Sequence, residues 1–175
     1  MHILENKRIL LRALEPEDID VLYNWENDSS IWHLSSTITP FSKYTLKKYI
    51  EQAHQDIFEA KQLRLIIQQK QDSSIIGAVD LFDYDPVHHR AGVGILIGNP
   101  EDRNQGYGTE VLQTLREYAF GTLSMKQLYC NICEDNEESL NLFIKQGYVI
   151  TGHKKDWIKK GDKWLSEYFL QLVRI

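Results

Sequence analysis

A short loop with two glycines is the part of the chain whose residue types and spacing point most directly to chemistry. It reads Arg103-Asn104-Gln105-Gly106-Tyr107-Gly108, after an apolar run at 93–98 and before an amphipathic run at 109–120. Glycine lets the backbone approach a ligand closely and adopt φ > 0. Free N–H groups and the positive end of a helix dipole then face outward, which favours phosphate binding. The loop therefore predicts a site for a nucleotide-type cofactor.

Two better-known phosphate loops do not fit this sequence. A dinucleotide-binding fingerprint needs a third glycine where this chain has Val111, and no glycine pair satisfies the P-loop spacing. A general nucleotide-binding protein is therefore a weak interpretation. What remains is the pattern R/Q-x-x-G-x-G/A, which by itself is a weak signal and gains meaning from its place between a strand and a helix.

Bulk properties favour a single globular domain over residues 1–175. The length allows a substantial core, and no apolar run is long enough to span a bilayer. The first eight residues lack the layout of a signal peptide, so we expect a cytoplasmic location. A formal net charge of −5 argues against nucleic acid as the main partner and mildly favours a cationic substrate. No membrane partner is expected.

The two cysteines form the pair Cys130-Asn131-Ile132-Cys133. Such a pair can bind zinc or perform redox chemistry. Here it lies in an apolar run that reads as a buried strand, where residues three apart point to opposite faces. We therefore predict two core cysteines and no metal site.

The periodicity predicts seven strands and four helices. Strands are expected at 8–14, 63–67, 75–84, 90–98, 127–133, 148–159 and 164–173, and helices at 15–27, 43–60, 109–120 and 136–146. The segment between the first two helices, with Trp32 and Pro40, reads as a loop. Asp135 and Glu138 suggest a capping box for the last helix, and Gly147 ends it. This order predicts a mixed α/β fold with a mostly antiparallel central sheet and helices on both faces.

This order and the glycine loop resemble the GNAT superfamily of N-acetyltransferases over essentially the whole chain. A second motif agrees, because Asn136, Ser139, Phe143 and Gly147-Tyr148 match the family's pattern after the post-loop strand. The segments 77–83, 88–91 and 157–164 resemble spermidine acetyltransferases, and ribosomal-protein N-terminal acetyltransferases are the other similar subgroup.

The resemblance implies transfer of an acetyl group from acetyl-CoA to a primary amine by direct attack on the thioester. Backbone N–H groups of 103–108 would bind the pyrophosphate, and Thr109 would add a hydroxyl. The strand at 94–97 would hydrogen-bond the pantetheine arm. The cofactor site is therefore expected to comprise Ile95, Leu96, Ile97, Arg103, Asn104, Gln105, Gly106, Tyr107, Gly108, Thr109, Asn136 and Phe143. A backbone N–H near Ile95 or Leu96 would stabilise the oxyanion.

Glycines at 92, 94 and 98 fit a close approach of that pantetheine arm. Tight packing against a neighbouring element is the alternative interpretation, and the sequence leaves both open.

The residue that deprotonates the amine is less evident. Several relatives carry a carboxylate where this chain has Gly92, so Asp80 and Asp83 are the nearest replacements. They should point to opposite faces of a strand, and the register with the spermidine group favours Asp80 as the catalytic residue. His88 and His89 sit beside a proline turn and are expected to be exposed.

Protonation of the leaving thiolate poses a second question. Many relatives place Tyr where Phe143 stands, and Phe has no proton to give. A thiol of pKa ~8.5 leaves tolerably as thiolate near neutral pH, so the departure does not exclude catalysis. Tyr148 is a substitute donor only if the geometry allows it.

The resemblance implies a small amine or a peptide N-terminus as acceptor, and it leaves open a polyamine, a protein N-terminus, an amino sugar or a small metabolite. Aromatic and acidic side chains suited to a cation lie at Trp25, Glu26, Asp28, Trp32 and Trp157, although core packing and surface acids explain them equally well. The family tendency suggests a homodimer. The losses at Gly92 and Phe143 keep open a second class, a catalytically idle acyl-CoA-binding or regulatory module.

Overall fold

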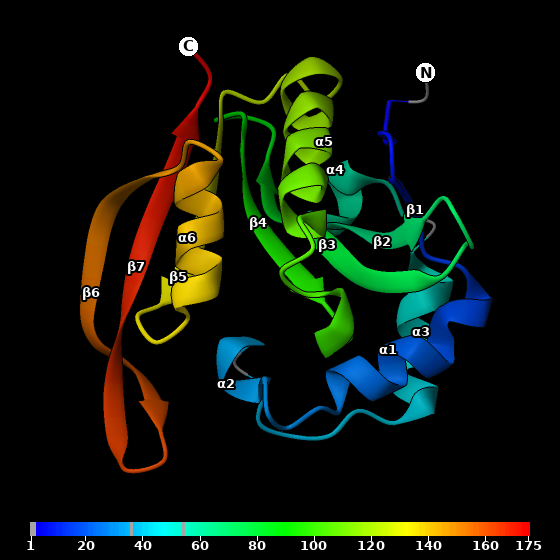
Figure 1. The fold of residues 1–175 in the computed structure, drawn as a ribbon, viewed down its shortest axis with the longest axis horizontal. Helices are drawn as coiled ribbons and strands as arrows, with labels where there is room; N and C mark the ends of the chain where they lie inside the picture. Colours follow the sequence, from blue (N-terminus) through cyan, green and yellow to red (C-terminus); the bar gives the residue numbers. More distant parts are fainter. Residues whose placement is uncertain (1–2, 36, 54) are drawn as a thin grey trace.

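A twisted seven-stranded sheet forms the centre of the molecule in the computed structural model, which describes residues 3–35, 37–53 and 55–175 (Figure 1). Its strand order is β1-β2-β3-β4-β5-β7-β6. The strands are β1 (Ile9–Ala13), β2 (Leu63–Gln69), β3 (Ile75–Asp85), β4 (Arg90–Ile97), β5 (Gln127–Cys133), β6 (Val149–Lys160) and β7 (Lys163–Val173). All neighbouring pairs are antiparallel except β4 and β5. The predicted strands and the closing hairpin are confirmed.

Two of the helices, α5 and α6, lie on one face of the sheet (Figure 1). The α-helices are α1 (Ile19–Glu26), α2 (Trp32–Ser35), α3 (Lys43–Gln52), α4 (Ile57–Ala60), α5 (Tyr107–Gly121) and α6 (Glu137–Lys145), with 3-10 turns η1 (Pro16–Asp18) and η2 (Pro100–Asp102). Among the described residues, no helix combines the length and the apolar character that crossing a bilayer requires.

The main core lies between the sheet and the helices α5 and α6. Val111, Leu112, Leu115 and Ala119 of α5 are buried in it, as their 3.6-residue spacing predicts, and Phe143 of α6 joins them. Burial of this apolar stripe stabilises α5 against the sheet.

A second apolar cluster joins α1 to α3 through Leu22, Leu46 and Ile50. Leu65 of β2 belongs to the main core, whereas the adjacent Arg64 contacts α1 and α3. Because successive strand residues point to opposite faces, α1 and α3 cover the face opposite α5.

The helical segments between α1 and β2 differ from the prediction. The helix expected over 43–60 is divided, because Asp56 caps a new helix by accepting the N–H groups of Phe58 and Glu59. His54, within that prediction, lies outside the described residues. The segment expected as a loop contains the one-turn helix α2.

The cap of α6 also differs from the prediction. Asn136, rather than Asp135, accepts the N–H of Ser139 at 3.2 Å. The Asp135 carboxylate instead pairs with the Lys160 ammonium at 2.6 Å. Gly147, with φ at +91°, follows the helix end as predicted.

The sheet opens between its two central strands. β4 pairs with β5 only from Arg90 to Gly92, whereas its other edge pairs with β3 as far as Ile97. The β4 edge at 93–97 therefore has no strand partner facing β5 in the described part of the chain. Unpaired strand edges offer N–H and C=O groups to a ligand.

Candidate active site

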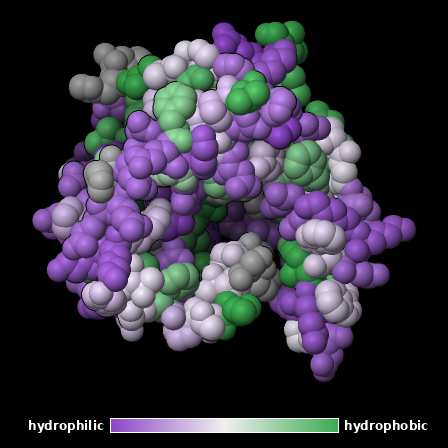
Figure 2. All heavy atoms as spheres, turned by 180° about the vertical axis from the view of Figure 1, so that it is seen from behind, coloured by the Kyte–Doolittle hydropathy of each residue, from purple (hydrophilic) through white to green (hydrophobic). Residues whose placement is uncertain are grey.

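A cleft of about 570 Å³ lies where β4 and β5 separate. Val93, Gly94, Ile95 and Leu96 of β4 line one side and residues 130–133 of β5 the other. Figure 2 shows the molecule from behind. A hollow lies in the middle of this rear face, with hydrophobic residues inside the hollow. The opening in the sheet is thus accessible from the face opposite α5 and α6.

The glycine loop begins one short turn after β4 and leads directly into α5. Gly106 is the N-cap of α5 with φ at +85°, and Asn104 also has positive φ at +59°. In the described part of the chain, the N–H groups of 104, 105 and 106 donate no hydrogen bond to protein. Arg103 ties the loop to the end of β4 by donating to the carbonyls of Ile97 and Gly98 at 3.2 and 3.4 Å. Free donors at a helix N-terminus suit a pyrophosphate.

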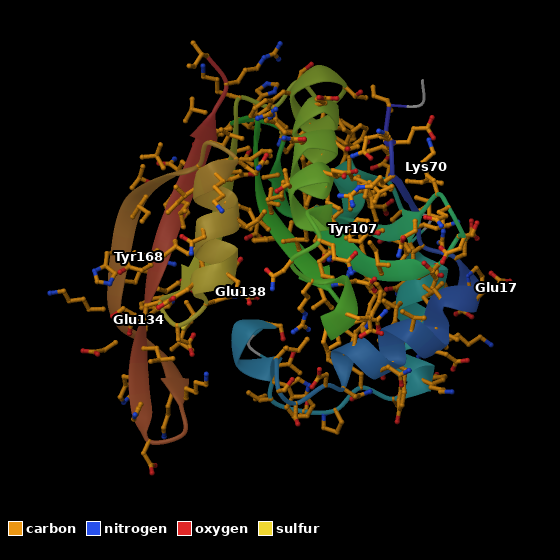
Figure 3. All side chains as sticks on the ribbon, in the orientation of Figure 1. Glu17, Lys70, Tyr107, Glu134, Glu138 and Tyr168 are labelled. Atoms are coloured by element: carbon orange, nitrogen blue, oxygen red, sulfur yellow. The ribbon has the colours of Figure 1, made fainter. Side chains whose placement is uncertain are left out.

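Two residues of the predicted loop, Tyr107 and Gly108, have packing roles in the structure. Tyr107 lies at the start of α5 (Figure 3), where its ring is buried and its hydroxyl donates to Gln69 Oε1 at 2.9 Å. Only its backbone N–H is left for a cofactor. Gly108 permits close packing of α5 on α6, since a Cβ there would lie 2.9 Å from Leu142. Thr109 follows in the first turn and is half-buried.

Most of the other residues predicted for the cofactor meet at the cleft. Ile95 and Leu96 line it from β4, and Asn136 and Phe143 line it from α6. Ile97 is half-buried at the end of the same strand edge. The side-chain oxygen Oδ1 of Asn136 accepts the helix-capping hydrogen bond. Its side-chain NH₂ group is therefore the donor that remains for a ligand.

Two of the three strand glycines are explained by rings rather than by a ligand. A Cβ on Gly92 would lie 2.3 Å from the Phe82 ring, and one on Gly98 would lie 2.1 Å from Trp25. The packing interpretation therefore fits Gly92 and Gly98. Gly94 alone leaves room, with its nearest neighbour at 3.8 Å.

Replacement of Gly92 by Ala is expected to lower the free energy of unfolding by about 1–3 kcal/mol, because the new methyl group overlaps the Phe82 ring. Denaturant titration measures the loss. The double variant Gly92→Ala, Phe82→Leu should recover most of it, since the shorter side chain vacates that space. An additive double variant would contradict this packing.

An ion-pair network forms the wall of the cleft beside Gly94. Asp80 Oδ1 accepts from Arg64 Nε at 2.8 Å and from Gln62 Nε2 at 3.2 Å, and Glu26 Oε1 accepts from Arg64 at 2.7 Å. Burial lowers the pKa of Arg64, but the charge of Asp80 and its hydrogen bond, together with the charge of Glu26, outweigh burial and raise the pKa overall. Arg64 is therefore a permanent cation that two carboxylates share.

Sequence reasoning missed Arg64 and Gln62. Glu26 lies 38 residues and Asp80 16 residues from Arg64 in the chain. The pairing of β2 with β3 and the packing of α1 bring them together. A single arginine in an apolar strand was the one available signal.

Asp83 does not line the cleft. It is exposed with φ at +48°, in the irregular part of the β3–β4 pairing, and accepts from the Tyr129 hydroxyl at 3.2 Å. Burial, together with the Asp83 charge, raises the pKa of Tyr129 to about 12. His88 and His89 are exposed in the following turn, as predicted.

The thiols and phenol near the cleft are weak acids. Burial raises the pKa of Cys130 to about 12 and raises that of Cys133 as well. Both cysteines are buried and free, and the described residues form no cluster of three or more metal-ligating side chains. Tyr148 packs edge-on to Phe143 with ring centres 4.9 Å apart, and burial raises its pKa. It is poorly placed to donate a proton.

The residues proposed for a cationic substrate divide between two places. Trp25 and Glu26 line the cleft. Trp32 and Trp157 line a neighbouring cavity between the α2 region and the β6–β7 hairpin. Asp28 is exposed and accepts from the Ser30 hydroxyl at 2.6 Å.

Comparison with known proteins agrees with this fold. Residues 8–149 match the model of the acetyltransferase (GNAT) domain. The spermidine N(1)-acetyltransferase of Vibrio cholerae is 24% identical over 151 residues, which cover 85% of this chain and 83% of that protein. The uncharacterized N-acetyltransferase YnaD of Bacillus subtilis is 25% identical over 174 residues, or 99% of this chain and 97% of that protein.

The solved structure of spermidine N-acetyltransferase from Vibrio cholerae, in complex with CoA and spermine, has the same fold. It has a TM-score of 0.86 at 21% identity and covers 96% of each chain. The predicted fold class is confirmed. Because the domain match spans most of the sequence, the chain belongs to the GNAT family and is an acetyl-CoA-dependent N-acetyltransferase.

Proposed function

We propose that this enzyme acetylates a small cationic primary amine, with spermidine as the first candidate. The observation that carries the proposal is the network in which Glu26 and Asp80 share one arginine at the cleft. Two carboxylates against one guanidinium leave a net negative charge, which attracts an ammonium group. The spermidine acetyltransferases among its relatives support the same acceptor class.

The acetyl-CoA would lie with its pyrophosphate on the loop 103–108 and its pantetheine arm along the free edge of β4. Residues Ile95, Leu96 and Ile97 would hydrogen-bond that arm, with Thr109, Asn136 and Phe143 completing the site. An N–H of β4 near Ile95 or Leu96 would stabilise the oxyanion. These assignments rest on the position of the cleft beside Gly94 and on the free N–H groups of the loop.

Asp80 would receive the ammonium group and assist its deprotonation. An alkylammonium of pKa ~10.4 is almost fully protonated at neutral pH, and a positioned base contributes ~10²–10⁴ in rate. Arg64 and Gln62 both donate to Oδ1, so Oδ2 is the oxygen for the amine or a bridging water. Because Phe143 has no proton to give, the thiol would leave as thiolate.

The domain is proposed to span 1–175, since the sheet is completed by β6 and β7, beyond the matched residues 8–149. A homodimer and a cytoplasmic location stay predictions of the sequence.

Thiol release from acetyl-CoA tests the function directly. The purified protein is mixed with acetyl-CoA and, separately, spermidine, spermine, lysine, an aminoglycoside and a short peptide with a free N-terminus. Release with spermidine or spermine is expected. Thiol release with the peptide alone would contradict the proposed polyamine acceptor and indicate a protein N-terminus instead. Binding of CoA without thiol release in the presence of any amine would favour the idle acyl-CoA-binding module.

A further inference from the structure

The N-terminal strand reaches the glycine loop through one long side chain. Arg8, immediately before β1, donates from its guanidinium to the carbonyl of Gln105 at 3.1 Å. The same group forms an ion pair with Glu110 in the first turn of α5 and lies over the Tyr107 ring, 4.5 Å from its centre. A residue about a hundred positions away thus contacts three residues of the loop and its helix.

The contact with Gln105 fixes the direction of one peptide group. The described peptide bonds are all trans, and in a trans peptide the C=O and the N–H point in opposite directions. Because the Gln105 carbonyl is directed at Arg8, the N–H of Gly106 is directed away from Arg8. That N–H has no protein acceptor in the described part of the chain. Rotation of this peptide would instead present the carbonyl oxygen to an anion.

The contact with Glu110 removes an opposing charge. Glu110 lies one turn into α5, its side chain is 22% exposed, and its Oε2 is buried without a described hydrogen-bond partner. A carboxylate uncompensated at this point would repel a pyrophosphate at the N-terminus of α5. The guanidinium of Arg8 balances that carboxylate.

We infer that Arg8 is a positioning residue of the acetyl-CoA site, which aims the Gly106 N–H at the pyrophosphate and neutralises Glu110 behind it. This inference rests on the proposed pyrophosphate site at 103–108. Arg8 acts through the loop, so it affects the affinity for the cofactor and leaves the acceptor site unchanged.

Isothermal titration calorimetry with CoA measures the cofactor affinity and needs no amine acceptor, so it tests the inference directly. Arg8→Ala is expected to bind CoA about tenfold more weakly, the order of effect for losing a charge-assisted hydrogen bond. Arg8→Lys should not restore affinity, because a single ammonium lacks the planar fork that spans the carbonyl and the carboxylate. Lys7→Ala is the matched control, since Lys7 is exposed, carries the same charge and has no described contact with the loop.

A second measurement separates positioning from general damage to the fold. With an amine that the wild type accepts, Arg8→Ala should raise the KM for acetyl-CoA and leave the KM for the amine unchanged. Its turnover of S-acetylpantetheine, which has no pyrophosphate, should equal that of the wild type. Equal losses with both thioesters, full rescue by Arg8→Lys, or unchanged CoA affinity in Arg8→Ala would overturn the inference. Failure of the wild type to bind CoA would instead overturn the proposed cofactor site.

Discussion

Replacement of Gly106 by Val is expected to weaken CoA binding about 100-fold, equivalent to about 2.8 kcal/mol. Gly106 has φ at +85°, a conformation that costs an L-residue about 1–2 kcal/mol and a β-branched one more. A Cβ there would also lie 3.3 Å from an Arg8 guanidinium nitrogen. The loop would relax to another backbone conformation, which would move the N–H of Gly106. Titration with CoA measures the effect.

Gly161 provides the matched control for backbone strain. It has φ at +60° in the turn between β6 and β7, with open space where a Cβ would stand. Gly161→Val should therefore lower the free energy of unfolding about as much as Gly106→Val does. Its affinity for CoA should equal that of the wild type. Equal loss of CoA affinity in both variants would show that strain in the fold, rather than the loop, controls binding.

Removal of the Asp80 carboxylate is expected to lower kcat/KM for the amine about 100-fold, within the range for loss of a general base. The affinity for CoA should change less than about twofold, because Asp80 lies on β3, away from the loop, and normal cofactor binding would show that the fold is intact. The variants are Asp80→Ala and Asp80→Asn, assayed by thiol release with saturating acetyl-CoA. If Asp80 acts as a base, kcat falls. If it only binds the ammonium, the KM for the amine rises.

Asp83→Asn is the control for this experiment. Asp83 lies three residues further along the same strand, is exposed, and does not line the cleft. Its replacement should leave kcat/KM within about twofold of wild type, since distant and unconnected sites act independently. A larger loss at Asp83 than at Asp80 would reverse the assignment.

Most of the fold is encoded in local sequence patterns. The stripe of Val111, Leu112 and Leu115 predicts which face of α5 is buried, and Gly147 predicts the end of α6. Such features depend on neighbours within one or two turns, so periodicity and backbone preference suffice. The split at Asp56 was missed because a single side-chain cap outweighed a continuing apolar pattern.

Contiguous patterns of residues were enough to predict the family, the loop at 103–108 and the order of the strands, but not the short helices α2 and α4. Which residues face one another depends on contacts between elements that are distant in the chain. In the folded chain Phe82 packs against Gly92, Arg64 lies between Glu26 and Asp80, and Arg8 contacts the loop. These contacts join strands and helices far apart in the chain, and their pairing register and packing are set by burial of the whole core, which no local pattern of residues contains.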